Sequence, residues 1–337
     1  MCLINSKTLH ISTDEKFIKP FIEVIYNNFN NNDHQFIFLS KGNSLSNTNQ
    51  HVTHINKKRQ IIKLSYLLNT SDKIILHGIF SHMLVNILFL QPWILKKCYW
   101  VMWGGDFYFP KKQRWLKKRV IKKIKNFVTY LKGDFELVKK WYGAKGIMHE
   151  SFMYPSNLFK EVNSLNRVNV DSTTNIMIGN SADPSNNHIE ILHKLSEFKE
   201  KDISIYAPLS YGDDTHAKLV AKKGIEIFGD KFIPLTEFMD TDKYVEFLNN
   251  IDIAIFAHNR QQGMGNTISL LGMGKKVYMK NDITPWTLFG EIGVKVFDFN
   301  SIDLEPINRE VMSENIKIIK TYFSEDKYIR QLEILFK

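Results

Sequence analysis

The sequence predicts an α/β protein of two similar domains, each built on an open and mostly parallel sheet. Short apolar, strand-like runs alternate with segments of helical periodicity along most of the chain, as in βαβ units. The chain has 337 residues, which is long for one core and suggests two domains of about 150 residues each. Hydrophobic residues make up 44% of it, enough for two well-filled cores and too many for a disordered chain.

The first domain is expected to span residues 1–154. Its strand-like runs are 10–12, 36–40, 73–77, 99–103, 127–131 and 146–152. The helical segments between them are 15–29, 80–90 and the basic run of 111–125. From residue 154 to 173 the periodicity weakens and Pro155, asparagine and serine accumulate, which indicates the domain boundary.

The second domain is expected to span residues 155–307 and to repeat the alternation. Its strand-like runs are 175–178, 203–206, 225–228, 251–256, 276–279 and 295–297. Its helical segments are 187–199, 215–223, 241–249 and 267–273. The tail, residues 308–337, has the periodicity of one or two helices, which are expected to pack back on the first domain. Two such Rossmann-like domains facing each other predict a central cleft.

Cysteine content and hydropathy exclude several classes of protein. Cys2 and Cys98 are too few for a disulfide framework or a zinc site, as expected in a reducing cytoplasm. The first residues lack the apolar core of a signal peptide. The longest apolar stretch, residues 83–95, contains Asn86 and Pro92 and is shorter than the roughly 20 residues that span a bilayer. We therefore expect a cytoplasmic protein that does not cross a membrane.

A polar, glycine-containing turn follows the first strand of the second domain. The segment IMIGNSADPSNNHIE runs from an apolar strand through small and amide residues into a helix. Such a turn lets backbone N–H groups approach a phosphate, and the helix end adds partial positive charge. The candidate residues are Gly179, Asn180, Ser181, Asp183, Ser185, Asn187 and His188. The alternative is an ordinary loop in which Asp183, Pro184 and Ser185 simply begin a helix.

A second turn of this kind follows the strand at 251–256. Arg260 offers a rigid fork for phosphate, and the neighbouring glutamines offer amide hydrogen bonds. The candidate residues are Arg260, Gln261, Gln262, Gly263, Gly265, Asn266 and Thr267, of which Asn266 or Thr267 is expected to cap the next helix. A plain strand-to-helix turn is the alternative. Together the two turns predict a nucleotide-linked ligand whose diphosphate Arg260 neutralises.

Two further loops of the second domain are candidates for a base or sugar pocket. The residues are Tyr206, Tyr211, Thr236 and Glu237, and a loop without function is the alternative. Asp240 and Asp242 have the spacing of a metal-binding pair, but they lie where a helix begins and acidic residues are favoured there. No metal site is therefore expected.

The positive charge of the chain is concentrated in one run. The net charge is +10, and no acidic residue lies between Asp106 and Asp134. The basic residues are Lys111, Lys112, Arg114, Lys117, Lys118, Arg119, Lys122, Lys123 and Lys125. At helical spacing one face would carry Leu116, Val120, Ile124, Phe127 and Leu131. With Trp115, this helix suits an anionic lipid surface; nucleic-acid binding and a merely solvated basic face are the alternatives.

Two titratable residues end neighbouring strands of the first domain. Asp106 lies in WGGDFY, among glycines and aromatic rings, where a partly enclosed carboxylate can act as general base. His77 ends the preceding strand and is the competing candidate for that role. The alternative for both is a structural role at a strand end.

The segments IMIGNSADPSNNHIE, RQQGMGNTISLL and WGGDFY together resemble glycosyltransferase family 56. The similarity runs from about Lys73 to Phe299, and WGGDFY is similar to the family's WGADLY with Gly105 and Phe107 changed. The resemblance implies a GT-B-like fold, with an N-terminal acceptor domain and a C-terminal nucleotide-sugar domain. It also implies transfer of 4-acetamido-4,6-dideoxygalactose from a dTDP-sugar to a polyprenyl-diphosphate-linked glycan, for enterobacterial common antigen, by a peripheral protein of the inner membrane's cytoplasmic face.

Under this hypothesis the two turns bind the diphosphate of the donor, and Arg260 with the helix end near Thr267 stabilises the leaving group without a metal ion. Asp106 or His77 would orient or deprotonate the acceptor hydroxyl from across the cleft. Two rivals remain open: a sugar-nucleotide epimerase or hydrolase of the same shape, and a non-catalytic nucleic-acid-binding protein.

Overall fold

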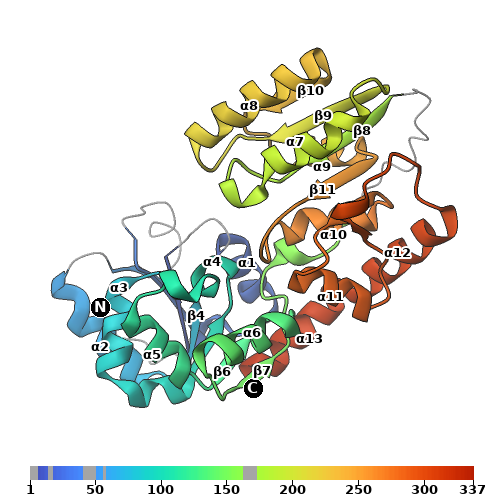
Figure 1. Ribbon diagram of the computed structural model, residues 1–337. Helices are drawn as coiled ribbons and strands as arrows, with labels where there is room; N and C mark the ends of the chain where they lie inside the picture. Colours follow the sequence, from blue (N-terminus) through green and yellow to red (C-terminus); the bar gives the residue numbers. More distant parts are fainter. Residues whose placement is uncertain (1–6, 14–17, 41–50, 56–57, 162–172) are drawn as a thin grey trace. The chain divides into compact units, whose positions relative to one another are not determined.

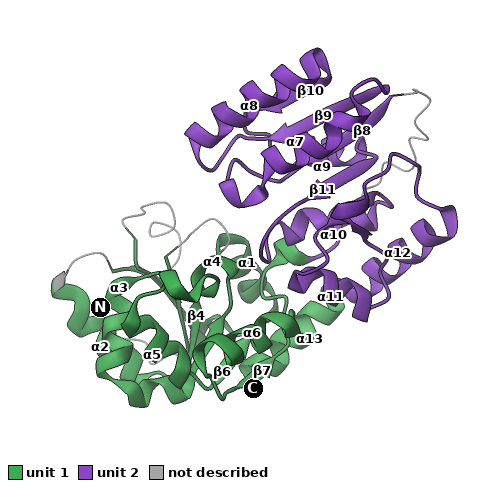
Figure 2. Cartoon of the chain, viewed as in Figure 1, with its two compact units in different colours: residues 1–157, 325–337 green, residues 158–324 purple. Residues whose placement is uncertain are grey.

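The computed structural model describes residues 7–13, 18–40, 51–55, 58–161 and 173–337. The chain divides into two compact units (Figure 2), residues 1–157 with 325–337 (unit 1) and residues 158–324 (unit 2). Residues 15–17 of the first expected helix, most of the expected boundary segment, and Cys2 lie outside the described residues.

Unit 1 contains a parallel sheet of seven strands in the order β3-β2-β1-β4-β5-β6-β7. The strands are β1 (Thr8–Ser12), β2 (His34–Phe38), β3 (Val52–His54), β4 (Lys73–His77), β5 (Cys98–Val101), β6 (Asn126–Val128) and β7 (Ile147–His149). The central strand β1 pairs on both sides, so that Thr8 is level with His34 and Lys73. Since all the strands are parallel, their carboxyl ends lie at one edge of the sheet.

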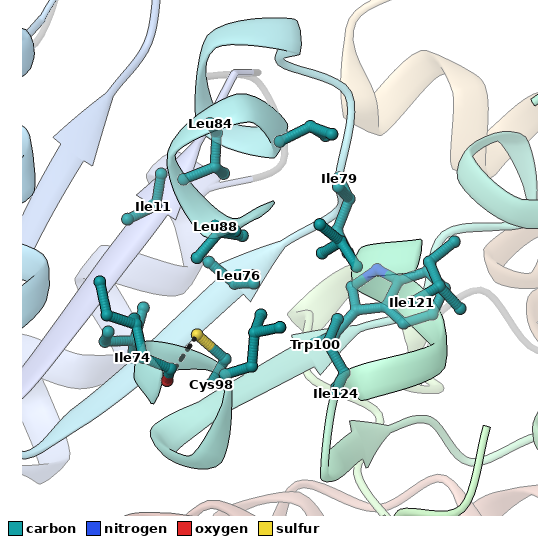
Figure 3. Packing of buried hydrophobic residues seen from close by; sticks show 14 of the residues in the cluster. Ile11, Ile74, Leu76, Ile79, Leu84, Leu88, Cys98, Trp100, Ile121 and Ile124 are labelled. Carbon is teal, nitrogen blue, oxygen red and sulfur yellow. Dashed lines mark hydrogen bonds between the residues drawn. The ribbon is translucent and has the colours of Figure 1, made fainter. Parts of the chain in front are cut away.

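Helices cover both faces of this sheet. The helices are α1 (Ile18–Asn28), α2 (Ile61–Thr70), α3 (His82–Leu90), α4 (Gly104–Phe107), α5 (Trp115–Lys123), α6 (Lys132–Tyr142) and α13 (Glu325–Phe336). Helices α2, α3, α5 and α6 contribute to one buried core with alternate residues of the strands. In Figure 3 Leu84 and Leu88 of α3 and Ile121 of α5 surround Leu76 and Trp100 of the sheet. Residues of α1 and α13 contact the intervening strand residues, among them His10.

Unit 2 contains a parallel sheet of six strands in the order β10-β9-β8-β11-β12-β13. The strands are β8 (Thr174–Ile178), β9 (Ile203–Pro208), β10 (Phe232–Leu235), β11 (Ile253–Phe256), β12 (Lys276–Met279) and β13 (Phe297–Asp298). The helices are α7 (His188–Leu195), α8 (Asp214–Phe228), α9 (Thr241–Asn249), α10 (Met264–Gly272), α11 (Thr284–Glu291) and α12 (Arg309–Tyr322). The chain proceeds outward from β8 in one direction and from β11 in the other, so these neighbours form the topological switch point (Figure 1).

The tail was expected to form one or two helices that pack on the first domain, and its two helices belong to different units. Helix α12 packs against α10 in unit 2, whereas α13 belongs to unit 1. Tyr328 of α13 donates its hydroxyl to the carbonyl of Met153 (3.0 Å), and Lys73 donates to the carbonyl of Leu335 (2.6 Å). Helix α13 is therefore an integral part of unit 1.

Two expectations for the secondary structure are wrong. Residues 225–228 end helix α8, and the strand follows at β10. The strand β10 contains Pro234, which a strand tolerates at a sheet edge and which obscured it in the sequence. Helix α5 ends at Lys123, so Phe127 lies in β6 and the apolar stripe does not continue to Leu131. Of the helices that the structure describes, none has both the length and the hydropathy to span a bilayer.

Candidate functional site

The two turns singled out in the sequence lie side by side at the switch point of unit 2. One follows β8 and the other follows β11, and these strands are hydrogen-bonded neighbours. His258 Nε2 lies 2.9 Å from Asn186 Oδ1, and Ser185 Oγ lies 2.6 Å from Gln262 Oε1, so side chains join the turns directly. Open α/β sheets bind ligands at this position, outside the carboxyl ends of the strands.

Asn186 holds the first turn in shape. Its Oδ1 accepts the backbone N–H of Asn180 (2.9 Å) as well as His258, and its Nδ2 donates to Ser181 Oγ (3.2 Å) and to the carbonyl of Asp183 (2.9 Å). The side chain is fully buried. Asn186 and His258 were not among the predicted site residues, because the contact that joins them links positions 72 residues apart in the chain.

Glycine is required at both turns. Gly179 has φ +64° and Gly263 has φ +65°, a region that favours glycine. A Cβ at Gly179 would lie 2.5 Å from His188 Nε2 and 2.9 Å from Asn186 Oδ1. A Cβ at Gly263 would lie 3.2 Å from the side chain of Asn180. At both glycines the backbone therefore lies so close to polar side chains that these would have to move to admit a Cβ atom.

Replacing Gly179 by alanine should lower the free energy of unfolding of unit 2 by about 2–4 kcal/mol, from strain at positive φ and from the contact with His188. Gly143 is a matched control, because it is also left-handed, with φ +67°, and a Cβ added there would meet only the end of the Lys122 side chain, at 3.7 Å. Gly143→Ala should cost only the strain of positive φ, about 1 kcal/mol. Urea denaturation measures both, and equal losses would contradict the close approach at Gly179.

Two helices begin at these turns without a side-chain cap. The cap residues of α7 and α10 are Asn187 and Gly263, both left-handed, and neither side chain accepts a hydrogen bond from the first turn. Helix α11 also begins without one, whereas α8, α9 and α12 are capped by Asp213, Asp240 and Asn308. First-turn N–H groups of α7 and α10 are therefore available to an anion.

This arrangement corrects one prediction. Neither Asn266 nor Thr267 caps α10, because the helix already begins at Met264. Thr267 is buried within the helix, and its hydroxyl donates back to the carbonyl of Gly263 (3.1 Å). Asn266 donates instead to the hydroxyl of Tyr244 (2.8 Å).

The described residues of unit 2 leave two buried side-chain atoms without a hydrogen-bond partner, and both lie at these turns: Asn180 Oδ1 and His188 Nε2. Buried polar atoms are almost always paired, so these two point to polar groups of a ligand. Burial lowers the pKa of His188 to about 3, assisted by the nearby His216, whose Nε2 lies 3.3 Å from His188 Nδ1. The imidazole is therefore neutral at pH 7.

Arg260 and Asp183 supply the charges of the site. Burial raises the pKa of Asp183, but hydrogen bonds from Ser185 lower it. The positive charge of Arg260 adds to this lowering, so that the pKa lies below its usual value. Burial, together with the positive charge of Arg260, lowers the pKa of His258 to about 3. Arg260 therefore acts on both turns, while its Nη1 donates to the carbonyl of Gln261 (3.1 Å).

The remaining pocket candidates are divided. Tyr211 lies beside the first turn, where Asn180 Nδ2 donates to its hydroxyl (3.3 Å). Tyr206 lies within β9 and packs its ring against Phe247 of α9, away from the turns. Thr236 and Glu237 are exposed after β10. Asp240 caps α9 by accepting from the N–H of Lys243 (2.9 Å), as its position at a helix start predicted.

Asp106 of unit 1 is fully buried rather than partly enclosed. Its Oδ2 accepts from the N–H of Ile79 (2.9 Å) and from Trp100 Nε1 (2.8 Å), and its Oδ1 accepts from the N–H of Trp103 (3.2 Å). Burial raises its pKa to about 7, against the charge of Lys117 and these hydrogen bonds. The carboxyl group joins the ends of β4 and β5, and its hydrogen-bonding capacity is used by the protein.

Asp106→Ala should lower the free energy of unfolding of unit 1 by about 3 kcal/mol, because it leaves buried N–H groups unpaired. Asp106→Asn keeps an acceptor for Ile79 and Trp100, and we expect it to restore most of the stability and of the turnover. Denaturation and initial-rate measurements on both variants distinguish the roles: an asparagine variant that is stable but inactive would show that Asp106 acts as a base.

His77 belongs to a chain of buried imidazoles. His77 Nε2 lies 3.1 Å from His10 Nδ1, and His10 Nε2 lies 3.0 Å from His34 Nδ1. At the other end His77 Nδ1 lies 2.7 Å from the hydroxyl of Tyr154, which also accepts from Trp103 Nε1 (3.0 Å). Burial lowers the pKa of His77 to about 3 and that of His34 to about 4, and it lowers that of His10 well below 6.5. These rings are neutral at pH 7, and His77 is a weak base.

The basic run forms η4 (Pro110–Lys112) and α5, with Val120 and Ile121 buried in the core of unit 1. Lys111, Lys112, Arg114, Arg119, Lys122 and Lys123 are exposed, while Lys117 and Lys118 are partly covered. Trp115 is also exposed. The run is therefore a core helix with a solvent-facing basic surface.

Two parallel Rossmann-like sheets, with paired anion-type turns at the switch point of the second, are the architecture of GT-B glycosyltransferases. A glycosyltransferase from Rickettsia africae superposes with a TM-score of 0.68 at 14% identity, covering 98% of each chain. Anabaena Alr3699/HepE, in complex with UDP and glucose, gives a TM-score of 0.69 at 11% identity and covers 98% of this chain and 99% of that one. WaaG, a glycosyltransferase involved in lipopolysaccharide biosynthesis, gives 0.56 at 9%, covering 97% and 93%. The fold is GT-B.

The family model for 4-alpha-L-fucosyltransferase, glycosyl transferase group 56, matches residues 10–321. The chain belongs to glycosyltransferase family 56, and it is a glycosyltransferase that uses a nucleotide-sugar donor and a glycan acceptor.

Proposed function

We propose that this enzyme transfers a 4-acetamido-4,6-dideoxygalactose residue from a dTDP-sugar to a polyprenyl-diphosphate-linked glycan during bacterial surface polysaccharide synthesis. The observation that carries the donor half is the pair of turns in unit 2, where two uncapped helix N-termini meet two unpaired buried atoms and Arg260. Membership of family 56 supports the choice of donor sugar and acceptor in this proposal.

The diphosphate would be held by N–H groups of the first turns of α7 and α10. Arg260 would stabilise the negative charge that grows on the leaving group as the glycosidic bond breaks. We propose that these groups do this work without a metal ion. His188, neutral and fixed beside Gly179, would hydrogen-bond a phosphate oxygen through Nε2 when His216 donates to its Nδ1.

Asp106 and His77 support the acceptor side from within unit 1. Asp106 fixes the backbone at Trp103, and His77 with Trp103 fixes the hydroxyl of Tyr154. We propose that both act as positioning residues. Trp103 packs edge-on against the exposed ring of Phe80 (5.8 Å between centroids), and aromatic faces of this kind stack on sugars.

Calorimetric titration with dTDP, UDP and GDP tests the proposal, first with EDTA and then with magnesium. Metal-independent binding that prefers dTDP supports it. A preference for UDP or GDP would leave the enzyme a glycosyltransferase but would mean that its donor carries a different nucleotide and sugar. Turnover of the donor at a useful rate without acceptor would identify a hydrolase or epimerase instead.

We further propose that the enzyme works on the anionic cytoplasmic face of the inner membrane, where its acceptor is anchored. The basic surface of α5 supports this location, since lysines and arginines near a membrane are attracted to acidic lipids.

A further inference from the structure

An apolar groove lies between α2 and α3 of unit 1. It has a volume of about 470 Å³ and is lined by Ile61, Ile62, Ser65, Tyr66, Ile87, Leu90 and Gln91. Ile62 is 81% exposed and Leu90 is 72% exposed, which is unusual for large aliphatic side chains. Trp93, directly after α3, is 58% exposed. The groove and these three residues are called the α2–α3 groove below.

The core of unit 1 does not account for these side chains. Helix α2 already buries Leu64, Leu67 and Leu68, and α3 buries Leu84 and Leu88 (Figure 3). The exposed residues of α3 are His82, Asn86 and Leu90, so its outward apolar surface is confined to the C-terminal end, next to the groove. An exposed aliphatic side chain at the edge of an apolar groove is available to contact a second apolar environment.

Polar side chains fix the two walls of the groove. Gln91 donates to Ser65 Oγ (2.7 Å) and accepts from Asn69 Nδ2 (2.7 Å). Trp93 Nε1 donates to Asn69 Oδ1 (2.8 Å). The exposed apolar side chains are therefore presented by a rigid framework rather than by a loose loop.

Helix α3, which forms one wall of the groove, also contacts the basic helix α5. Helices α3 and α5 pack together, and the ring of Phe89 lies 5.5 Å from that of Trp115. Trp115 is 58% exposed, with the guanidinium of Arg119 5.2 Å over its ring. The segment between Asp106 and Asp134 contains no acidic residue, and Arg114, Arg119, Lys122 and Lys123 of this segment are exposed. Unit 1 thus presents exposed aliphatic and tryptophan side chains together with a basic helix.

We propose that the α2–α3 groove is the membrane-docking surface of this enzyme and takes an acyl chain of an anionic bilayer. Ile62, Leu90 and Trp93 enter the boundary between head groups and acyl chains, while Arg114, Lys118 and Arg119 of the neighbouring segment contact lipid phosphates. Charge complementarity selects an anionic bilayer, and the aliphatic groove excludes a nucleic acid, which would be bound through phosphate contacts alone. The proposal rests on the peripheral location proposed above and needs neither donor nor acceptor.

Co-sedimentation with vesicles of 70% phosphatidylcholine and 30% phosphatidylglycerol, at 0.1 M and 0.5 M NaCl, tests it. Ile62→Ser with Leu90→Ser should weaken binding by about tenfold or more at both salt concentrations, because buried apolar area is lost. Arg114→Gln with Lys118→Gln should weaken binding mainly at 0.1 M NaCl, because added salt screens these charges. Leu219→Ser with Ile225→Ser is the matched control, since both side chains are 52% exposed on α8 of unit 2, and it should bind as the wild type does.

Unchanged binding of the Ile62/Leu90 variant would overturn the proposal and leave a purely electrostatic surface. Dimerisation of the wild type without vesicles, abolished in that variant, would also overturn it by making the groove an interface between copies of the chain. Titration of the same variants with dTDP keeps the two proposals separate: loss of vesicle binding with intact nucleotide binding affects the membrane surface alone.

Discussion

Replacing Arg260 by alanine is expected to lower kcat about 100- to 1000-fold while leaving both units folded. The side chain is half-buried, and its guanidinium donates to the carbonyl of the neighbouring Gln261, a local contact whose loss disturbs little of the framework. Its charge nevertheless reaches both turns, as the lowered pKa values of Asp183 and His258 show. Removal of one group that stabilises developing negative charge typically costs this much.

Initial rates with the donor and a lipid-linked acceptor measure the effect, and thermal denaturation confirms the fold. Arg260→Lys keeps the charge without the planar fork and should retain part of the activity. Arg309→Ala, which removes an exposed arginine from α12 of the same unit, is the control and should be fully active. Wild-type turnover in Arg260→Ala would refute the role of Arg260 at the diphosphate.

Acidification from pH 7 to pH 5.5 is expected to destabilise unit 1 by about 3 kcal/mol through His10, His34 and His77, or about 1 kcal/mol per histidine. Each pKa in the folded state lies below the value of about 6.5 in an unfolded chain. Below pH 6.5 the unfolded chain therefore binds protons that the folded unit does not, and stability is lost as the pH falls. Above pH 6.5 the contribution is constant. His188 and His258 act in the same sense on unit 2.

Urea denaturation followed by tryptophan fluorescence at pH 7 and pH 5.5 measures this loss. His34→Asn keeps an acceptor near His10 without a group that titrates, so the pH-dependent part of the loss in unit 1 should shrink by about a third. A pH-independent free energy of unfolding would show that the buried imidazoles are not neutral in the folded protein.

The sequence predicted the strands of the sheets well where they are apolar and central. The strands at 73–77 and 276–279 and the helix at 241–249 begin and end where they were expected. The errors concern short or edge elements, such as β3 with three residues and β10 with Pro234. Few apolar residues mark such strands, and their pairing with a neighbour, which the local sequence does not show, defines them.

The sequence predicted the two turns of the site but not the hydrogen bonds that join them. Strand–turn–helix order placed Gly179 and Arg260 at the carboxyl ends of strands, and the adjacency of β8 and β11 brings their turns together. The contacts of Asn186 with His258 and of Asn266 with Tyr244 depend on residues far apart in the chain. The sequence also did not show which side chains are buried. Asp106 and His77 are residue types that often act as catalytic bases, but both are enclosed and hydrogen-bonded in the structure.

The path of the chain has a consequence for synthesis on the ribosome. Unit 1 takes its first strand from the start of the sequence and α13 from residues 325–336, with all of unit 2 between them. Phe336 of α13 packs against the rings of His10 and His34, so the aromatic layer over the histidine chain is incomplete until α13 emerges. Unit 2 can thus finish folding while unit 1, which precedes it in the sequence, still exposes an apolar face of its sheet. A nascent chain of this protein has to keep that face from aggregating for the time needed to translate more than half of its length.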